Sequence, residues 1–289
     1  MKTMVKVILN DEIIDRSEAA IDIEDRGYQF GDGVYEVIRV YDGVLFTGDE
    51  HLERFYSSAE KIKITVPFQK EDLLDLMNQL IRVNNVHDGS IYMQLTRGAS
   101  PRNHVFPSVD TKPVLTAYTK EVARPVESLE NGVAAMVAED IRWLRCDIKS
   151  LNLLPNLLAK QAATEQGCYE AILHRNGLVT EGSASNAYIV VDGKIKTHPA
   201  TNLILNGITR QVVARLCKEN NIPFSEEAFT LDELRNADEI FVTSTTSEVM
   251  PVVKLDEREV GNGKPGEVTR KLQTLFVEEF EAVKQAYSM

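Results

Sequence analysis

Two-residue turns recur between short apolar segments along this chain, at Asn10-Asp11, Asp42-Gly43, Asn176-Gly177 and Asp192-Gly193. Asn, Asp and Gly tolerate the positive φ that tight β-hairpin turns require. Segments joined in this way pair antiparallel, whereas a doubly wound parallel sheet needs a helix between successive strands. We therefore predict an α/β (mixed α+β) fold with mixed or antiparallel sheets.

Helical periodicity lies between these hairpins. Apolar residues recur at three- and four-residue intervals after Thr47, whose spacing from Glu50 matches a capping box, and again from Leu73 to Ile81. We expect further helices from about Pro155 to Gly167, from about Arg210 to Glu219 and after Pro265. Thr230 and Glu233 repeat the capping-box spacing.

The periodicity fades between about Lys120 and Gly132, where Arg124-Pro125 and charged residues stand. This predicts an N-terminal domain over residues 1–122, an interdomain linker over 123–132 and a larger C-terminal domain over 133–289.

The net charge and the length of the apolar segments exclude two classes of binding partner. The chain has 44 acidic and 32 basic residues and a formal charge of −12, so its surface repels phosphate backbones and we expect no nucleic-acid partner. The apolar run Ala187–Val191 is too short to span a bilayer, so we expect no membrane partner. Three cysteines without a CxxC spacing indicate the reducing cytoplasm.

Several common chemistries lack their motifs. No GxGxxG or GxxxxGK[ST] pattern is present, so dinucleotide and P-loop phosphate sites are not expected. The five histidines never stand at HxxxH spacing, so we expect no metal. Ser58 and Lys61 match the SxxK motif of serine acylation, but no SDN or KTG accompanies them, and we interpret the match as chance.

Residues 141–150 hold three basic residues against one acid, and they include the only tryptophan, Trp143. One interpretation is a solvated basic face beside a core tryptophan. The other is a reactive lysine, Lys149, because neighbouring cations disfavour an ammonium and leave an amine that can form an imine with an aldehyde.

Two other segments have a structural and a functional interpretation. Thr180–Asn186 is either a surface loop or a turn that holds the carboxylate of Glu181 against a planar cofactor. Asn206–Arg210 is either an ordinary helix start or an anion site made of helix amides and a hydroxyl. Ser244–Ser247 is a second hydroxyl-rich candidate. An imine lysine, a carboxylate for the pyridine nitrogen and a phosphate site are together what pyridoxal 5'-phosphate needs.

The combined pattern resembles a known family. Its parts are Asp147-Ile148-Lys149-Ser150-Leu151-Asn152, Glu181-Gly182-Ser183, Gly207-Ile208-Thr209-Arg210 and the segment from Asp25 to Glu36. They are similar to the fold-type IV pyridoxal-phosphate enzymes, which include branched-chain aminotransferases, D-amino-acid aminotransferases and aminodeoxychorismate lyase. Thr96-Arg97-Gly98 and Arg102-Asn103-His104 resemble the D-amino-acid aminotransferases most. The resemblance covers nearly the whole chain and implies a small N-terminal α/β domain and a C-terminal domain with a barrel-like sheet.

By this resemblance, Lys149 would hold the cofactor and act as the catalytic base, and Glu181 would stand at the pyridine nitrogen. Leu205 would pack on the ring. The phosphate would be held by residues from three segments, namely Arg54, Ile208, Thr209, Ser244 and Thr245.

The resemblance also implies a trap for the substrate α-carboxylate made of Tyr35, Arg102 and His104. Arg102 and His104 would come from the partner in a homodimer, and the trap would select the D enantiomer. Ala184 departs from the pattern, because a second serine is expected there. The expected reaction is amino transfer between D-amino acids, such as D-alanine or D-glutamate, and 2-oxo acids, such as pyruvate or 2-oxoglutarate. The alternatives are a branched-chain L-amino-acid aminotransferase and a non-catalytic phosphate-binding protein on the same scaffold.

Overall fold

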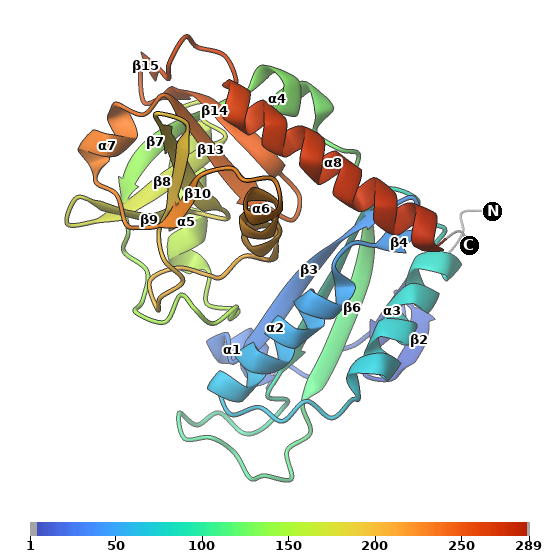
Figure 1. Cartoon of the computed structure of the whole chain (residues 1–289). Coiled ribbons are helices and arrows are strands. Elements are labelled where there is room, and N and C mark those ends of the chain that lie inside the picture. The colour runs from blue at the N-terminus through green and yellow to red at the C-terminus, as the bar shows by residue number, and fades with distance from the viewer. Residues whose placement is uncertain (1–4, 288–289) are drawn as a thin grey trace. The chain divides into compact units, whose positions relative to one another are not determined.

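The structure, a computed structural model, describes residues 5–287 (Figure 1). The contacts divide them into two compact units. The first unit comprises residues 5–123, the segment Ile148–Asn152 and residues 283–287; the second comprises Arg124–Asp147 and Leu153–Ala282. Residues 1–4 and 288–289, which the expected domains include, lie outside the described residues.

The first unit is built on one antiparallel sheet with the strand order β2-β1-β6-β5-β3-β4. Helices α2 and α3 lie on one face of this sheet (Figure 1), where apolar residues of β3 and β5 meet Leu52, Phe55, Leu73 and Met77 in a buried core. The elements are β1 (Lys6–Leu9), β2 (Glu12–Asp15), α1 (Arg26–Phe30), β3 (Gly33–Tyr41), β4 (Val44–Leu45), α2 (Gly48–Lys61), α3 (Lys70–Val83), β5 (Gly89–Thr96) and β6 (Val114–Glu121).

The second unit contains a mixed sheet with the order β12-β11-β10-β13-β14-β7-β8-β9, and β15 pairs with β14. Its elements are α4 (Val126–Asn131), β7 (Val133–Glu139), α5 (Leu154–Glu165), β8 (Glu170–Arg175), β9 (Leu178–Gly182), β10 (Asn186–Val191), β11 (Lys194–Thr197), α6 (Ile208–Glu219), β12 (Phe224–Glu226), α7 (Leu231–Arg235), β13 (Glu239–Ser244), β14 (Glu248–Leu255), β15 (Arg258–Glu259) and α8 (Glu267–Tyr287).

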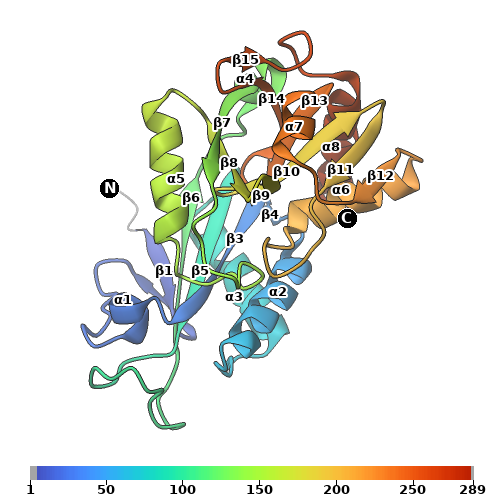
Figure 2. The same ribbon diagram turned by 90° about the vertical axis from the view of Figure 1, so that its left-hand side faces the viewer.

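This second sheet curls. Strands β9 and β10 are not paired in the sheet order, yet they contact each other, and they lie close together in Figure 2. β7 runs parallel to both β8 and β14, and α5 connects β7 to β8. The prediction of a mixed fold with hairpin-rich sheets is confirmed, because antiparallel pairs dominate and the parallel pairs are few.

All four predicted hairpins form. They are β1–β2, β3–β4, β8–β9 and β10–β11. Asp42 and Gly43 adopt φ of 50° and 80°, and Asn176 and Gly177 adopt 50° and 82°. Positive φ at both central residues is the geometry that twists with the flanking strands.

Of the two capping boxes that the sequence predicts, only one forms. Thr230 and Glu233 form the predicted capping box at α7. The box expected from Thr47 and Glu50 is wrong, because Thr47 has φ of 55° and its side chain caps no helix amide. Only Phe46 and Thr47 connect β4 to α2, and this short connection places Thr47 in the left-handed region.

The chain crosses between the units more than once. The five residues Ile148–Asn152 group with the first unit, although both flanking stretches belong to the second. The expected linker over residues 123–132 contains helix α4, and the boundary itself stays a prediction. In the described part of the chain, no helix combines the length and apolar character that a membrane span needs.

Candidate active site

Lys149 lies in the segment Ile148–Asn152, which groups with the first unit. Its backbone oxygen accepts a hydrogen bond from Tyr35 N at 3.0 Å, and its amide donates to Ser58 Oγ at 3.3 Å. Leu151 N donates to Gly33 O, so the segment pairs with the start of β3. Because Ile148 is buried in the core of the first unit, the backbone on both sides of the lysine is anchored.

The lysine amine has an aromatic neighbour. Lys149 Nζ lies 4.2 Å from the centroid of the Tyr35 ring, and this ring stacks on Tyr92 at 5.8 Å. The structure thus brings together two of the residues that the sequence singled out. The neighbouring arginines that the sequence offered pair with carboxylates instead: Arg145 binds Asp147, and Arg142 binds Asp140 and Glu181. The core-tryptophan interpretation is also wrong, because Trp143 is 43% exposed.

A buried cluster beside β3 holds Arg54, which the sequence assigned to a phosphate. Its Nε and Nη2 donate to the two oxygens of Glu36 at 2.7 and 2.8 Å, and His51 Nδ1 lies 2.7 Å from Glu36 Oε2. Burial raises the pKa of Glu36, but Arg54 and His51 lower it far below its usual value. Burial lowers the pKa of His51, and the charges of Arg54 and Lys149 lower it further, although Glu36 raises it.

Sequence reasoning missed Glu36 and His51. The available signal was weak: His51 and Arg54 stand three residues apart on α2, which places them on one face of the helix. Nothing in their spacing points to Glu36 on β3.

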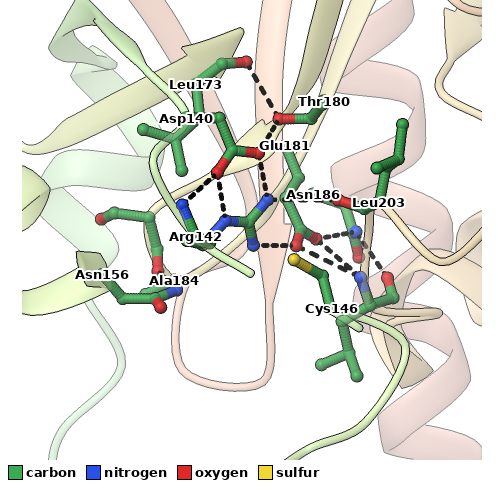
Figure 3. Close-up of polar contacts among 12 residues, drawn as sticks. Asp140, Arg142, Cys146, Asn156, Leu173, Thr180, Glu181, Ala184, Asn186 and Leu203 are labelled. Atoms are coloured by element: carbon green, nitrogen blue, oxygen red, sulfur yellow. Dashed lines mark hydrogen bonds and ion pairs between the residues drawn. The ribbon is translucent and has the colours of Figure 1, made fainter. Parts of the chain in front are cut away.

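Glu181, at the end of β9, lies in a dense polar network of the second unit (Figure 3). Arg142 Nη1 donates to its Oε1, Asn186 Nδ2 donates to Oε2 at 2.9 Å, and Leu205 N donates to Oε2 at 3.1 Å. The residue is 4% exposed. Burial raises the pKa of the Glu181 carboxyl group to about 7, although the Arg142 guanidinium lowers it.

Asp140 holds Arg142 from the opposite side. Two guanidinium nitrogens of Arg142 donate to Asp140 at 2.9 and 2.8 Å, and Arg175 and Thr180 also donate to that carboxylate. Sequence reasoning missed Asp140 and its connection to Glu181 through Arg142, because Asp140 follows β7 and Glu181 lies on β9, and only the fold brings these strands together.

The loop after Glu181 is held by a second carboxylate, Glu170. The hydroxyls of Ser183 and Ser185 both donate to it, as do the amides of Ser183 and Ala184. Ala184, the position that departs from the family pattern, therefore contributes its backbone here. Glu170 was not singled out in the sequence.

The predicted anion site lies where α6 begins. No side chain caps this helix, so the first amides, at Ile208 and Thr209, face no capping acceptor. Gly207 precedes them, and a Cβ atom there would lie 2.2 Å from Asn186 Oδ1, so the close approach requires glycine. Helix α6 contacts β13, which ends at Ser244, directly before Thr245.

These features fit a ligand that has a phosphate at one end and a basic ring nitrogen at the other. The start of α6 favours an anion through its amides and the helix dipole. Leu205, two residues before Gly207, bonds directly to Glu181, so the anion site and the buried carboxylate belong to one connected network. Within residues 5–287, no group of His, Cys, Asp and Glu side chains is arranged to hold a metal ion.

Arg102 and His104, the other residues predicted to bind the substrate carboxylate, lie on the exposed loop between β5 and β6. Arg102 and His104 are exposed, and both contact the ring of Phe30, at 4.5 Å from the guanidinium and 5.7 Å between ring centroids. The structure thus brings the two together.

Three kinds of similarity to known proteins agree with this geometry. Residues 33–255 match the model of the family described as amino-transferase class IV. The chain is 55% identical to a D-alanine aminotransferase of Staphylococcus haemolyticus, over 94% of this chain and 97% of that protein. It is 53% identical to a D-alanine aminotransferase of Bacillus licheniformis, over 93% and 95% of the two chains.

Solved structures of similar fold include the branched-chain amino acid aminotransferase of Escherichia coli, with a TM-score of 0.86 and 28% identity over 95% of this chain and 93% of that one. The branched-chain amino acid aminotransferase of Thermobaculum terrenum, solved as the holo form with PLP, has a TM-score of 0.84 and 25% identity over 96% and 94%.

Proposed function

Because this chain belongs to the class IV aminotransferases, we propose that it transfers the amino group between D-amino acids and 2-oxo acids with pyridoxal 5'-phosphate as cofactor. The observation that carries the choice of D-amino acids is the identity of 53–55% to D-alanine aminotransferases over more than nine tenths of the chain. Identity to the two branched-chain enzymes of the same fold is 28% and 25%, so the L-amino-acid alternative has less support.

When it is bound, pyridoxal 5'-phosphate supplies an aldehyde that takes up the substrate amino group and a ring that accepts the electrons of the broken Cα–H bond. Lys149 Nζ holds the cofactor and then accepts the proton from the substrate Cα. The anchored backbone of Ile148–Asn152 supports this role, because a base must be held within reach of the proton it removes.

Glu181 binds the ring nitrogen and keeps it protonated. Support comes from the three donors that orient its buried carboxylate, which leave it little freedom to turn away. Leu205 packs on the ring face. The amides of Ile208 and Thr209 bind the phosphate, together with Arg54, Ser244 and Thr245.

Tyr35, Arg102 and His104 bind the substrate α-carboxylate. The planar fork of arginine suits both carboxylate oxygens, and placing the carboxylate decides which Cα hydrogen faces Lys149. We propose that the chain acts as a homodimer in which Arg102 and His104 serve the partner's site. A cytoplasmic location agrees with three cysteines that are all free thiols.

The deciding experiment measures kcat/KM for three amino donors, D-alanine, L-alanine and L-leucine, with 2-oxoglutarate as the acceptor. We expect D-glutamate and pyruvate from D-alanine, at a kcat/KM that exceeds that for either L-amino acid. Preference for L-leucine would establish the branched-chain alternative. If no amino acid is converted and added cofactor gives no visible absorbance, the non-catalytic alternative holds.

A further inference from the structure

One arginine, Arg26, binds the backbone of the loop that carries Arg102 and His104. Arg26 Nη1 donates to Asn103 O at 2.6 Å and lies 3.5 Å from Val105 O, which are the two carbonyls on either side of His104. Arg26 is buried, whereas the loop residues are exposed. The backbone around His104 is therefore fixed by a side chain that belongs to the protein interior.

One aromatic ring contacts both exposed side chains. The Arg102 guanidinium carbon lies 4.5 Å from the Phe30 ring centroid, and the His104 ring meets Phe30 edge-on at 70°. The Arg26 guanidinium lies 4.8 Å from the same centroid. A guanidinium group over an aromatic face gains electrostatic attraction without losing its hydrogen-bonding fork.

Asp32 fixes Arg26 in turn. It accepts from Arg26 Nε at 2.8 Å and from Arg97 Nε and Nη2 at 2.8 and 2.9 Å. Burial raises the pKa of Asp32, but the hydrogen bonds and charges of the two arginines lower it below its usual value. Arg97 also donates to the carbonyls of Ile62 and Lys63, which ties the group to the end of α2.

The backbone that carries the Phe30 ring is also fixed. The side chain of Asp25 caps α1 by accepting from Gly27 N and also accepts from the Thr96 hydroxyl. Gly31 ends the helix with φ of 65°. Phe30 is thus the last residue of a short helix that is capped at both ends.

We infer that Arg26, Phe30, Asp32 and Arg97, here called the Phe30 cluster, are positioning residues that hold Arg102 and His104 in one arrangement and so determine the enantiomer preference. The inference rests on the proposed function, because it needs Arg102 and His104 to bind the substrate carboxylate. An exposed arginine has many rotamers, and ordering it in advance removes part of the entropic cost of binding. Since the carboxylate is bound before and during the reaction, the cluster acts on KM more than on kcat.

The test replaces Phe30 in the holoenzyme. Phe30→Leu keeps an apolar side chain and removes the ring, Phe30→Tyr keeps the ring, and Phe280→Leu is the matched control because Phe280 also lies under an arginine, Arg124, in the second unit. We measure kcat and KM for D-alanine, the D/L ratio of kcat/KM for alanine, and hydrogen exchange of the peptide covering residues 99–112.

For Phe30→Leu we expect KM to rise about threefold, which is the size of one exposed cation–π contact, with kcat nearly unchanged. The D/L ratio should fall and the exchange of residues 99–112 should become faster. Phe30→Tyr should restore all three, and Phe280→Leu should leave them at wild-type values. Unchanged KM, ratio and exchange in Phe30→Leu would overturn the inference, as would the same changes in Phe280→Leu.

Arg26→Lys is a second variant, because a single ammonium group cannot reach both Asp32 and the carbonyls beside His104. It should also speed exchange in residues 99–112, and exchange at the wild-type rate would contradict the proposed hold on the loop. The wild-type enzyme separates the two hypotheses. If it does not convert D-alanine, the proposed function and the role in enantiomer preference fail; if it does, unchanged variants disprove only the role of the Phe30 cluster.

Discussion

At Glu181 two opposing effects act on one carboxyl group. Burial disfavours the ionised form and raises the pKa to about 7, whereas the Arg142 guanidinium favours the ionised form. Asp140 on the far side keeps Arg142 in place. The charge available to a ring nitrogen at this position therefore depends on the whole series of Asp140, Arg142 and Glu181.

Glu181→Gln should still bind pyridoxal 5'-phosphate, because the phosphate contacts are unchanged, but it lacks the negative charge that sustains a protonated ring nitrogen. We expect Cα–H cleavage of D-alanine to slow by about 10²–10³-fold. Single-turnover absorbance measurements give this rate. Glu227→Gln, at an exposed position of the same unit, is the control, and a Glu181→Gln rate equal to that of the wild type would exclude the proposed role.

Lys149→Ala should abolish turnover while leaving the fold intact, because the half-buried amine contributes chemistry rather than core packing. Circular dichroism checks the fold, and the D-alanine assay checks activity. Borohydride treatment of the wild-type holoenzyme, followed by peptide mapping, should label Lys149. A label on another lysine, or near-normal activity of the variant, would contradict the assignment.

At the scale of elements, Asp140 connects three strands of the second unit. It follows β7, and its carboxylate accepts from Arg175 at the end of β8 and from Thr180 on β9. Burial raises its pKa, but the hydrogen bonds from Arg142 and Arg175 lower it well below its usual value of 3.8. A carboxylate with a lowered pKa stabilises the fold above its unfolded-state pKa, and this stabilisation is lost as the pH falls through the folded-state pKa.

Asp140→Asn should therefore lower the free energy of unfolding at pH 7 by about 3 kcal/mol, because it leaves the partly buried Arg175 guanidinium without an anion and Arg142 with Glu181 alone. The difference from the wild type should shrink as the pH falls below the usual value of 3.8. Urea unfolding of the variant and the wild type at several pH values measures this difference in the free energy of unfolding. Glu219→Gln, which breaks the exposed pair with Arg215, should change stability by less than about 1 kcal/mol. A difference for Asp140→Asn that does not vary with pH would contradict this account.

At the scale of the whole molecule, the proposed homodimer makes a distinct prediction. If Arg102 serves the partner's site, a mixed dimer of Lys149→Ala and Arg102→Ala chains has one doubly defective site and one intact site. Mixing the two inactive variants should restore activity, up to about one quarter of wild-type sites for random exchange at equal amounts in a twofold dimer. No recovery despite verified mixed dimers would place Arg102 in its own chain's site or outside the mechanism.

Local features of the sequence were enough to predict the hairpins and most helices. Asn-Gly and Asp-Gly pairs specify their turn through backbone conformations that few other residues tolerate, which is why the hairpins at Asp42-Gly43, Asn176-Gly177 and Asp192-Gly193 agree. The roles assigned to the motifs around Lys149, Glu181 and Gly207 stay predictions, and they rest on a similar kind of signal. Each needs particular residue types at short, fixed spacing, and such spacing is visible in one dimension.

Only the tertiary structure decided the partners of those residues. Arg54 binds Glu36 across 18 residues, Glu181 binds Arg142 across 39, and Arg26 reaches Asn103 across 77. The predicted Thr47 capping box is absent, because Thr47 lies in the left-handed region between β4 and α2 and its side chain accepts no hydrogen bond from the helix. A charged side chain pairs with whichever group the fold places within hydrogen-bonding distance, and that distance is set by strand order and packing rather than by position along the chain.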